Sequence, residues 1–223
     1  MLTNQQLIAS LEDSGVLRSK RIKDALLTFP REKFVPTDLV THAYEDRPLP
    51  IGEAQTISQP FTVVFMLELL DARVGHNVLE IGAGSAWQTA MLSYLVAAPH
   101  PSPLPRGEGT MGHVWAYEIN EAVGQFGKKN LERAGVEAAK GVHAAYAIGD
   151  ASKHWQEHAP YDRIIAGAAF IEIPDELRQL LKIGGRLVAP TQEQDVRVIE
   201  RMSQHKFSER IYPGFVFVPV VHG

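Results

Sequence analysis

Short apolar runs alternate with amphipathic stretches along roughly the last two thirds of the chain, from residue 77 onward. The runs have the length and composition of buried strands, and the stretches between them have helical periodicity. Strands are predicted over 77–81, 113–119, 144–148, 163–166 and 186–189, and helices over 87–96, 121–133 and 174–181. Gly135 is expected to end the second of these helices, and Gly184-Gly185 the third.

Two further strands, 196–202 and 215–221, are expected to close the chain in antiparallel pairing. Strands that alternate with helices are typical of an α/β fold with a mostly parallel sheet. The pattern therefore predicts a sheet of about seven strands with helices on both faces.

The first 56 residues follow a different pattern and predict a small helical and extended lead-in. Apolar residues at helical spacing predict two helices, with Ser19 capping the second and Pro30 ending it. A loop over 31–36, a short polar helix and an extended segment over 47–56 should follow. Ser58, before Gln59 and Pro60, is expected to cap the next helix. The apolar positions of the two helices are Leu7 and Leu11, then Ile22, Ala25, Leu26 and Phe29.

One segment, 99–112, does not fit this rhythm because it contains four prolines and three glycines. Such a composition predicts a surface loop. A tolerated insertion without function is favoured over a binding role. Apart from this insertion, we expect residues 1–223 to form a single domain.

The amino-acid composition excludes several classes of partner and of chemistry. Hydrophobic residues make up 45% of the 223 residues, charged residues 22%, and the net charge is −4, so neither nucleic acid nor a membrane is an expected partner. The absence of cysteine excludes disulfides and thiolate chemistry. No secretory signal and no apolar stretch approaching the roughly 18 residues of a membrane span are visible, which favours the cytoplasm. His154 and His158 lie four residues apart, but no acidic partner completes a metal site.

A glycine-rich turn follows the first predicted strand, in the segment 78–86. Its Gly82 and Gly84 allow a ligand to approach the backbone closely. A dinucleotide fingerprint would need a third small residue where Trp87 stands, and the indole would block that approach. Glu80 instead fits a site for S-adenosylmethionine (AdoMet), which has no phosphate.

Two more carboxylates follow strands at the same expected edge of the sheet. Glu118 lies 34 residues after Gly84, and removal of the 14-residue insertion leaves 20, which is about the offset expected for a ribose-binding acid. Asp150 follows Gly149 at the end of the third strand, where it could accept a hydrogen bond from an adenine amino group. The insertion joins a helix to the start of a strand, so it should lie at the opposite edge and spare the site.

Several blocks give the chain a wider resemblance. The segments 47–52 and 55–60 resemble the signature of the protein-L-isoaspartate O-methyltransferases, and the Thr56-Ile57-Ser58-Gln59-Pro60 block is specific to that family among AdoMet folds. The resemblance runs almost end to end, apart from the insertion. Further matching blocks are 31–36, 80–85, 161–162, 172–174, 182–188 and 217–219.

The resemblance implies a Rossmann-like AdoMet-dependent methyltransferase fold and a repair reaction. The methyl group of AdoMet passes to the free α-carboxylate of an L-isoaspartyl residue in a damaged protein or peptide, leaving S-adenosylhomocysteine. Ser58 would hydrogen-bond the accepting carboxylate, beside Thr56, Ile57 and Gln59. The implied cofactor residues are Glu80, Gly82, Ala83, Gly84, Ser85, Gln88, Glu118, Ile119, Gly149 and Asp150. No metal is expected, and the protein is expected to be a monomer or a dimer.

Some positions depart from the family pattern. Ala86 and Ala151 stand where the family commonly has glycine, and Glu53-Ala54 stand where a His-Gly or similar pair is common. Phe170 lies in a stretch that departs from the family and could narrow the substrate mouth. These departures leave two alternatives open: a diverged paralogue that binds AdoMet without catalysis, or a methyltransferase with another acceptor.

Overall fold

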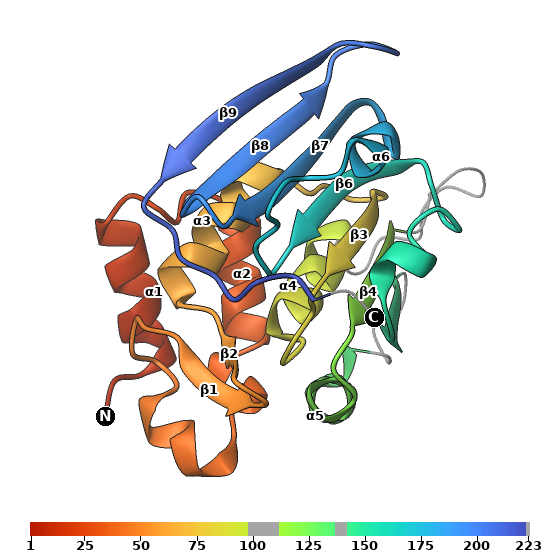
Figure 1. The fold of residues 1–223 in the computed structure, drawn as a ribbon. Coiled ribbons are helices and arrows are strands. Elements are labelled where there is room, and N and C mark those ends of the chain that lie inside the picture. The colour runs from red at the N-terminus through yellow and green to blue at the C-terminus, as the bar shows by residue number, and fades with distance from the viewer. Residues whose placement is uncertain (98–111, 137–141, 222–223) are drawn as a thin grey trace, which may run out of the picture.

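The computed structural model describes residues 1–97, 112–136 and 142–221. Its central feature is a seven-stranded sheet of order β5-β4-β3-β6-β7-β8-β9 (Figure 1). The five strands from β5 to β7 are parallel, and β8 and β9 are antiparallel. The strands are β3 (Asn77–Ile81), β4 (Gly112–Glu118), β5 (Val142–Ile148), β6 (Tyr161–Ala166), β7 (Leu181–Thr191), β8 (Asp195–Arg201) and β9 (Phe207–Pro213). The mostly parallel sheet predicted from the sequence is confirmed.

Elements of the first 57 residues match the predicted lead-in. Ser19 accepts a hydrogen bond from the backbone N–H of Ile22 and so caps the second helix, as predicted. A hairpin of two short strands precedes the helix α3 (Pro60–Leu70). The other elements here are α1 (Asn4–Asp13), α2 (Lys20–Thr28), the 3₁₀ helices η1 (Arg31–Phe34) and η2 (Thr37–His42), β1 (Leu49–Gly52) and β2 (Gln55–Ile57). The loop predicted over 31–36 is thus partly helical.

Both faces of the sheet are buried, because successive residues of its strands enter two different cores. On β3, Val78 belongs to the core formed with α1 to α3 and with α4 (Trp87–Val96). Leu79 belongs to a second core on the opposite face, with Trp155 and with α6 (Asp175–Gln179). Burial on both faces explains why these strands read as continuous apolar runs.

Three local predictions are wrong. The last strand is β9, and residues 215–221 instead form an irregular segment that touches Ala169 through an isolated bridge. The helix expected over 174–181 ends at Gln179, so Gly184-Gly185 lie inside β7, at an irregularity in its pairing with β6. The N-cap of α3 is Gln59, and no side chain caps this helix, so the capping role of Ser58 fails.

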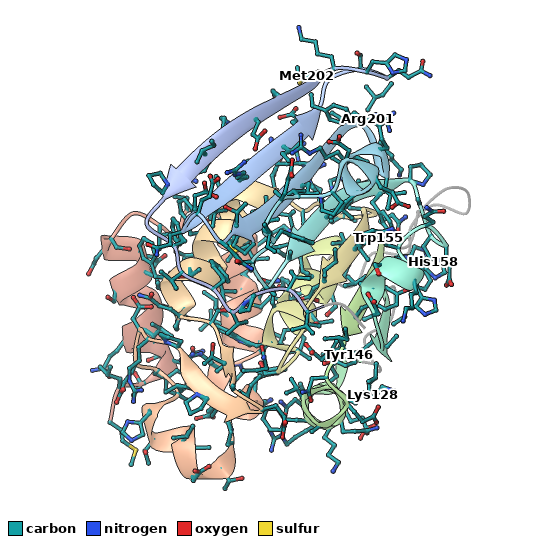
Figure 2. The ribbon with its side chains drawn as sticks, in the orientation of Figure 1. Lys128, Tyr146, Trp155, His158, Arg201 and Met202 are labelled. Atoms are coloured by element: carbon teal, nitrogen blue, oxygen red, sulfur yellow. The ribbon has the colours of Figure 1, made fainter. Side chains whose placement is uncertain are left out.

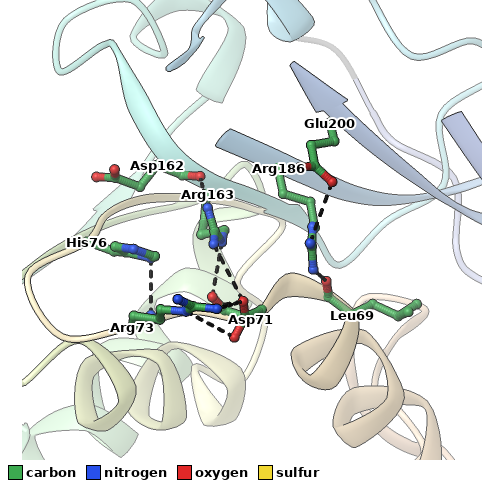
Figure 3. A network of polar contacts seen from close by, with 8 residues as sticks. All are labelled: Leu69, Asp71, Arg73, His76, Asp162, Arg163, Arg186 and Glu200. Carbon is green, nitrogen blue, oxygen red and sulfur yellow. Dashed lines mark hydrogen bonds and ion pairs between the residues drawn. The ribbon is translucent and has the colours of Figure 1, made fainter. Parts of the chain in front are cut away.

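Ion pairs and carbonyl contacts fasten α3 to the sheet at the amino-terminal edge of β6 and β7 (Figure 3). Arg163 donates from Nε to the carbonyl of Asp71 at 3.1 Å, and Arg186 donates to the carbonyl of Leu69 at 2.6 Å. These contacts hold the end of α3 opposite the glycine-rich turn. No helix among the described residues is long and apolar enough to cross a membrane.

The 99–112 insertion lies almost wholly outside the described residues, which resume at Gly112. Its flanks are close together, since a Cβ placed on Gly112 would lie 2.4 Å from the carbonyl oxygen of Val96. The flanks therefore meet at the start of β4, at the edge of the sheet where the sequence places the insertion.

Candidate active site

A cavity of about 350 Å³ opens at the carboxyl ends of the parallel strands. Its walls come from the glycine-rich turn after β3, the ends of β4 and β5, and the turn after β6. Convergence of strand ends at one edge of a parallel sheet is what makes this edge a ligand site. Of the predicted residues, it is lined by Thr56, Gly82, Gly84, Glu118, Ile119, Gly149 and Asp150.

Glu118 is fixed with its carboxylate in the cavity wall. Its Oε2 accepts from the backbone N–H of Gly84 at 2.8 Å, and its Oε1 accepts from the backbone N–H of Asn120 at 3.0 Å. Gly84 has φ +55, a conformation that glycine adopts without strain. Two backbone donors thus hold the side chain, whose remaining lone pairs suit the two hydroxyls of a ribose.

Asp150 follows β5 and caps the 3₁₀ helix η4 (Ala151–Lys153). Its Oδ1 accepts from both the backbone N–H and the hydroxyl of Ser152, at 2.9 and 2.7 Å. Ser152 and Trp155 also line the cavity, and sequence reasoning missed both. The turn after β5 therefore offers a fixed carboxylate beside an aromatic side chain.

Four predicted cofactor residues lie behind the cavity wall. Glu80 is fully buried and accepts a hydrogen bond from Gln88 at 3.0 Å. Burial raises the pKa of Glu80 to about 7, because the hydrogen bond from Gln88 offsets only part of the lost solvation. Ala83 and Ser85 are also buried, and the carbonyl of Ser85 accepts from Asn130. None of these four is among the residues that line the cavity.

A second cavity, of about 700 Å³, lies beside the first. Ser58 and Gln59 line only this second cavity, whereas Thr56, Gly167 and Val218 line both. Ile57 is buried and reaches neither. The shared residues place a serine hydroxyl next to, but outside, the cavity that contains Glu118.

Arg31 holds the segment that carries Ser58, and sequence reasoning missed this role. Its side chain is fully buried, and its guanidinium lies 5.5 Å from the ring of Trp87. Burial lowers the pKa of Arg31 to about 10, so it is charged at neutral pH. It donates to the carbonyls of Ala43, Glu45, Arg47, Ile57 and Ser58. An arginine buried among carbonyls has no signature in local sequence.

The segment after β9, residues 215–221, crosses the carboxyl ends of the strands (Figure 1, dark blue). Ala169 donates to the carbonyl of Val218, and Val220 donates to the carbonyl of Ala169, each at 2.8 Å. Residues 218–221 line the first cavity, and 215–218 line the second. This cross-strand segment therefore forms a wall of both.

The first cavity suits AdoMet better than a nucleotide with phosphates. Two carboxylates face it, and no lysine or arginine is among the described residues that line it. AdoMet carries a sulfonium cation, a ribose diol and an adenine, which match carboxylates, a diol acceptor and an aromatic wall. A pyrophosphate would be repelled by the same charges.

The family model described as Protein-L-isoaspartate(D-aspartate) O-methyltransferase (PCMT) matches residues 2–223. The chain belongs to this family. Enzymes of the protein-L-isoaspartate O-methyltransferase family are AdoMet-dependent carboxyl methyltransferases, which confirms the enzyme class expected from the sequence.

Individual relatives of known sequence or structure support the same family assignment. The protein-L-isoaspartate O-methyltransferase of Hyperthermus butylicus is 41% identical, covering 97% of this chain and 88% of the relative. That of Staphylothermus marinus is 39% identical, covering 97% and 93%. A solved protein-L-isoaspartate O-methyltransferase has a TM-score of 0.78 at 26% identity, covering 99% of this chain and 66% of that chain. A Plasmodium falciparum structure in complex with S-adenosyl-L-homocysteine has a TM-score of 0.82 at 19% identity, covering 98% of both chains, and so supports the fold.

The departures from the family pattern have distinct places in the fold. Ala86 takes up φ +66 in the buried start of α4, and Ala151 lies in the wall of the first cavity. Phe170 also lies in that wall and is not among the residues that line the cavity of Ser58, so its narrowing of the substrate mouth stays a prediction. Ala151 and Phe170 therefore line the first cavity, whereas Ala86 is buried at the start of α4.

Proposed function

We propose that Glu118, Asp150 and the glycine-rich turn hold AdoMet in the first cavity, while Ser58 orients an L-isoaspartyl carboxylate in the second. The observation that carries this proposal is the pair of adjacent cavities, which share Thr56, Gly167 and Val218. AdoMet, when bound, supplies an electrophilic methyl group on its sulfonium. The reaction then transfers that methyl group to the carboxylate of a damaged protein or peptide.

The protein residues act by binding and alignment. A carboxylate with a pKa near 4 is already ionised at neutral pH, so no general base is required. Glu118 would fix the ribose and Asp150 the adenine, which sets the position of the reactive end. The Ser58 hydroxyl would donate to the acceptor carboxylate and orient one of its oxygens. The apolar cross-strand segment 215–221 would help to exclude water.

The experiment for the acceptor is labelled-methyl transfer from AdoMet to an isoaspartyl peptide, with the normal aspartyl peptide as control. Transfer to the isoaspartyl peptide alone supports the proposal. Binding of AdoMet without transfer to either peptide would contradict it and favour the non-catalytic paralogue or another acceptor. Cytoplasmic location, oligomeric state and the absence of a nucleic-acid partner stay predictions.

Substitution of one serine in each cavity tests the proposed roles of the two cavities separately. Ser58→Ala should lower kcat/KM for the isoaspartyl peptide about tenfold or more, since a hydrogen bond to a charged group contributes about 1.5–3 kcal/mol. AdoMet affinity should change little. Ser152→Ala is the matched control. It should weaken AdoMet binding and leave kcat/KM for the peptide little changed at saturating AdoMet, because the Ser152 hydroxyl holds Asp150. Calorimetry and steady-state kinetics measure both, and loss of AdoMet binding in Ser58→Ala would contradict the assignment.

A further inference from the structure

The glycine-rich turn is held by hydrogen bonds on two sides. One side faces the first cavity, and the other faces away from it. The N–H of Gly84 donates to Glu118, and the carbonyl of Gly84 accepts from the Tyr146 hydroxyl at 2.8 Å. Tyr146 is not among the residues that line either cavity. The hydrogen bond to Gly84 is therefore a direct link from Tyr146 to the cavity wall.

Helix α5 (Glu121–Ala134) leaves room for this hydroxyl. A Cβ placed on Gly127 would lie 2.3 Å from Tyr146 Oη and 2.5 Å from the Gly84 carbonyl oxygen. Both distances are shorter than real contacts permit, so the approach of α5, β5 and the turn requires glycine here. Figure 2 shows Tyr146 beside α5, the helix that carries Lys128.

The next carbonyl of the turn is held in the same way. Asn130, three residues after Gly127 and on the same face of α5, donates to the carbonyl of Ser85 at 3.0 Å. Two side chains from behind the turn thus bind two consecutive carbonyls. A turn fixed at both carbonyls loses little freedom when a ligand binds in front of it.

Tyr146 can act as a donor throughout the neutral range. Burial raises the pKa of its hydroxyl above the ordinary tyrosine value, and the nearby charges of Glu118 and Glu80 act in the same direction. Tyr146 lies on β5 and is half-buried, and its hydroxyl has the Gly84 carbonyl as its hydrogen-bond acceptor.

The geometry points to Tyr146 as a positioning residue for the cofactor, which acts through Gly84 and depends on Gly127 for space. This inference rests on the proposed function, because it assigns AdoMet to the first cavity. Tyr146 does not touch the acceptor cavity, so its contribution belongs to cofactor binding alone.

The first test is Tyr146→Phe, which removes the hydroxyl and keeps the ring. The dissociation constant of S-adenosylhomocysteine, measured by calorimetry, should rise about 3- to 10-fold, the effect of one neutral hydrogen bond. At saturating AdoMet, kcat and the KM for the isoaspartyl peptide should stay unchanged. Tyr94→Phe is the matched control, since Tyr94 packs against Arg21 and lines neither cavity.

The second test is Gly127→Ala, whose methyl group would displace the same carbonyl and the same hydroxyl. It should weaken S-adenosylhomocysteine binding more than Tyr146→Phe does. The double variant should bind S-adenosylhomocysteine no more weakly than Gly127→Ala alone, because both changes break the same hydrogen bond between Tyr146 and Gly84.

The outcomes separate this inference from the proposed function. An unchanged dissociation constant in Tyr146→Phe, with normal binding by the unaltered protein, overturns the inference alone. A parallel fall in kcat and rise in peptide KM also overturns it, because Tyr146 would then be merely structural. No binding by the unaltered protein overturns both.

Discussion

Glu80 is a single residue whose ionisation the fold alters strongly. Its side chain is fully buried at the end of β3, and its Oε2 has no hydrogen-bond partner among the described residues. Burial raises its pKa from 4.5 to about 7. The folded protein therefore holds a proton that the unfolded chain has released between these two pH values.

The pH dependence of stability follows from this shift. The stabilisation from protonated Glu80 is complete below about pH 4.5 and is lost as the pH rises through about 7. Its full size is about 3 kcal/mol for a shift of this order. Glu80→Gln keeps an acceptor for Gln88 and removes the charge, so it should be more stable relative to the unaltered protein at pH 8 than at pH 5.

Urea unfolding of both proteins at the two pH values measures this difference. The exposed Glu132 provides the control Glu132→Gln for the loss of a surface carboxylate. A constant difference between Glu80→Gln and the unaltered protein at pH 5 and pH 8 would show that Glu80 is ionised in the folded state at both.

At the scale of elements, the hairpin of β1 and β2 has an unfavourable turn. Glu53 and Ala54 both have positive φ, +49 and +55, in a two-residue loop between Gly52 and Gln55. A turn with two such residues favours Asn-Gly or Gly-Gly, because a Cβ is strained there. The family pattern, which commonly has glycine at the second position, satisfies this requirement, and this chain does not.

Ala54→Gly should therefore stabilise the protein by about 0.5–1 kcal/mol. The relief of about 1–2 kcal/mol of left-handed strain exceeds the entropy cost of about 0.4–1 kcal/mol in the unfolded chain. Ala9→Gly, in the exposed middle of α1, is a control of opposite sign and should destabilise by about 1 kcal/mol. Urea unfolding checks both, and a loss of stability in Ala54→Gly would contradict the strain argument.

At the scale of the whole molecule, Asp71 joins α3 to the central strands (Figure 3). Its carboxylate pairs with Arg73 at 2.6 Å and with Arg163 at 3.8 Å. Burial disfavours the charge, but the hydrogen bond from Arg73 and the surrounding guanidinium groups hold the pKa of Asp71 below its ordinary value. The charge of Asp71 therefore stabilises the fold above about pH 4, and that stabilisation is lost as the pH falls.

Asp71→Asn removes this charge while keeping a side chain that tolerates the left-handed φ of +50. Unfolding at pH 7 should show a loss of about 1 kcal/mol, because the pair is partly exposed, and less in 1 M salt. The exposed Asp13 provides the control Asp13→Asn. A loss that does not depend on salt would show that the charge is not responsible.

The cross-strand segment 215–221 connects the two cavities at the same scale. Ending the chain after Gly214 removes walls of both cavities but little of either core. We expect weaker S-adenosylhomocysteine binding and loss of methyl transfer. The free energy of unfolding should fall by only about 1 kcal/mol, which lowers the melting temperature by a few degrees. Calorimetry and thermal unfolding measure these effects. Retained activity in the shortened chain would exclude a role for the segment.

Local patterns along the chain are enough to predict the parallel sheet and the carboxylates at its edge. Apolar runs and glycine-rich turns are local signals, and parallel strands bring their carboxyl ends to one edge whatever the connections between them. The positions of Glu118 and Asp150 could therefore be predicted from one sequence. Ser58 came from the specific Thr56–Pro60 block. It lines the second cavity, and its contact with the acceptor carboxylate stays a prediction.

The remaining features come from contacts between segments that are far apart along the chain. Strand β9 lies at the exposed edge of the sheet and carries Glu209 and Arg210, so it has no apolar run to reveal it. The apolar run at 215–221 looks like a strand, but it is apolar because it covers the two cavities. Arg31 and Tyr146 bind backbone carbonyls of residues distant in sequence. Such contacts depend on packing between distant segments, so the hydrophobic periodicity of the sequence does not predict them.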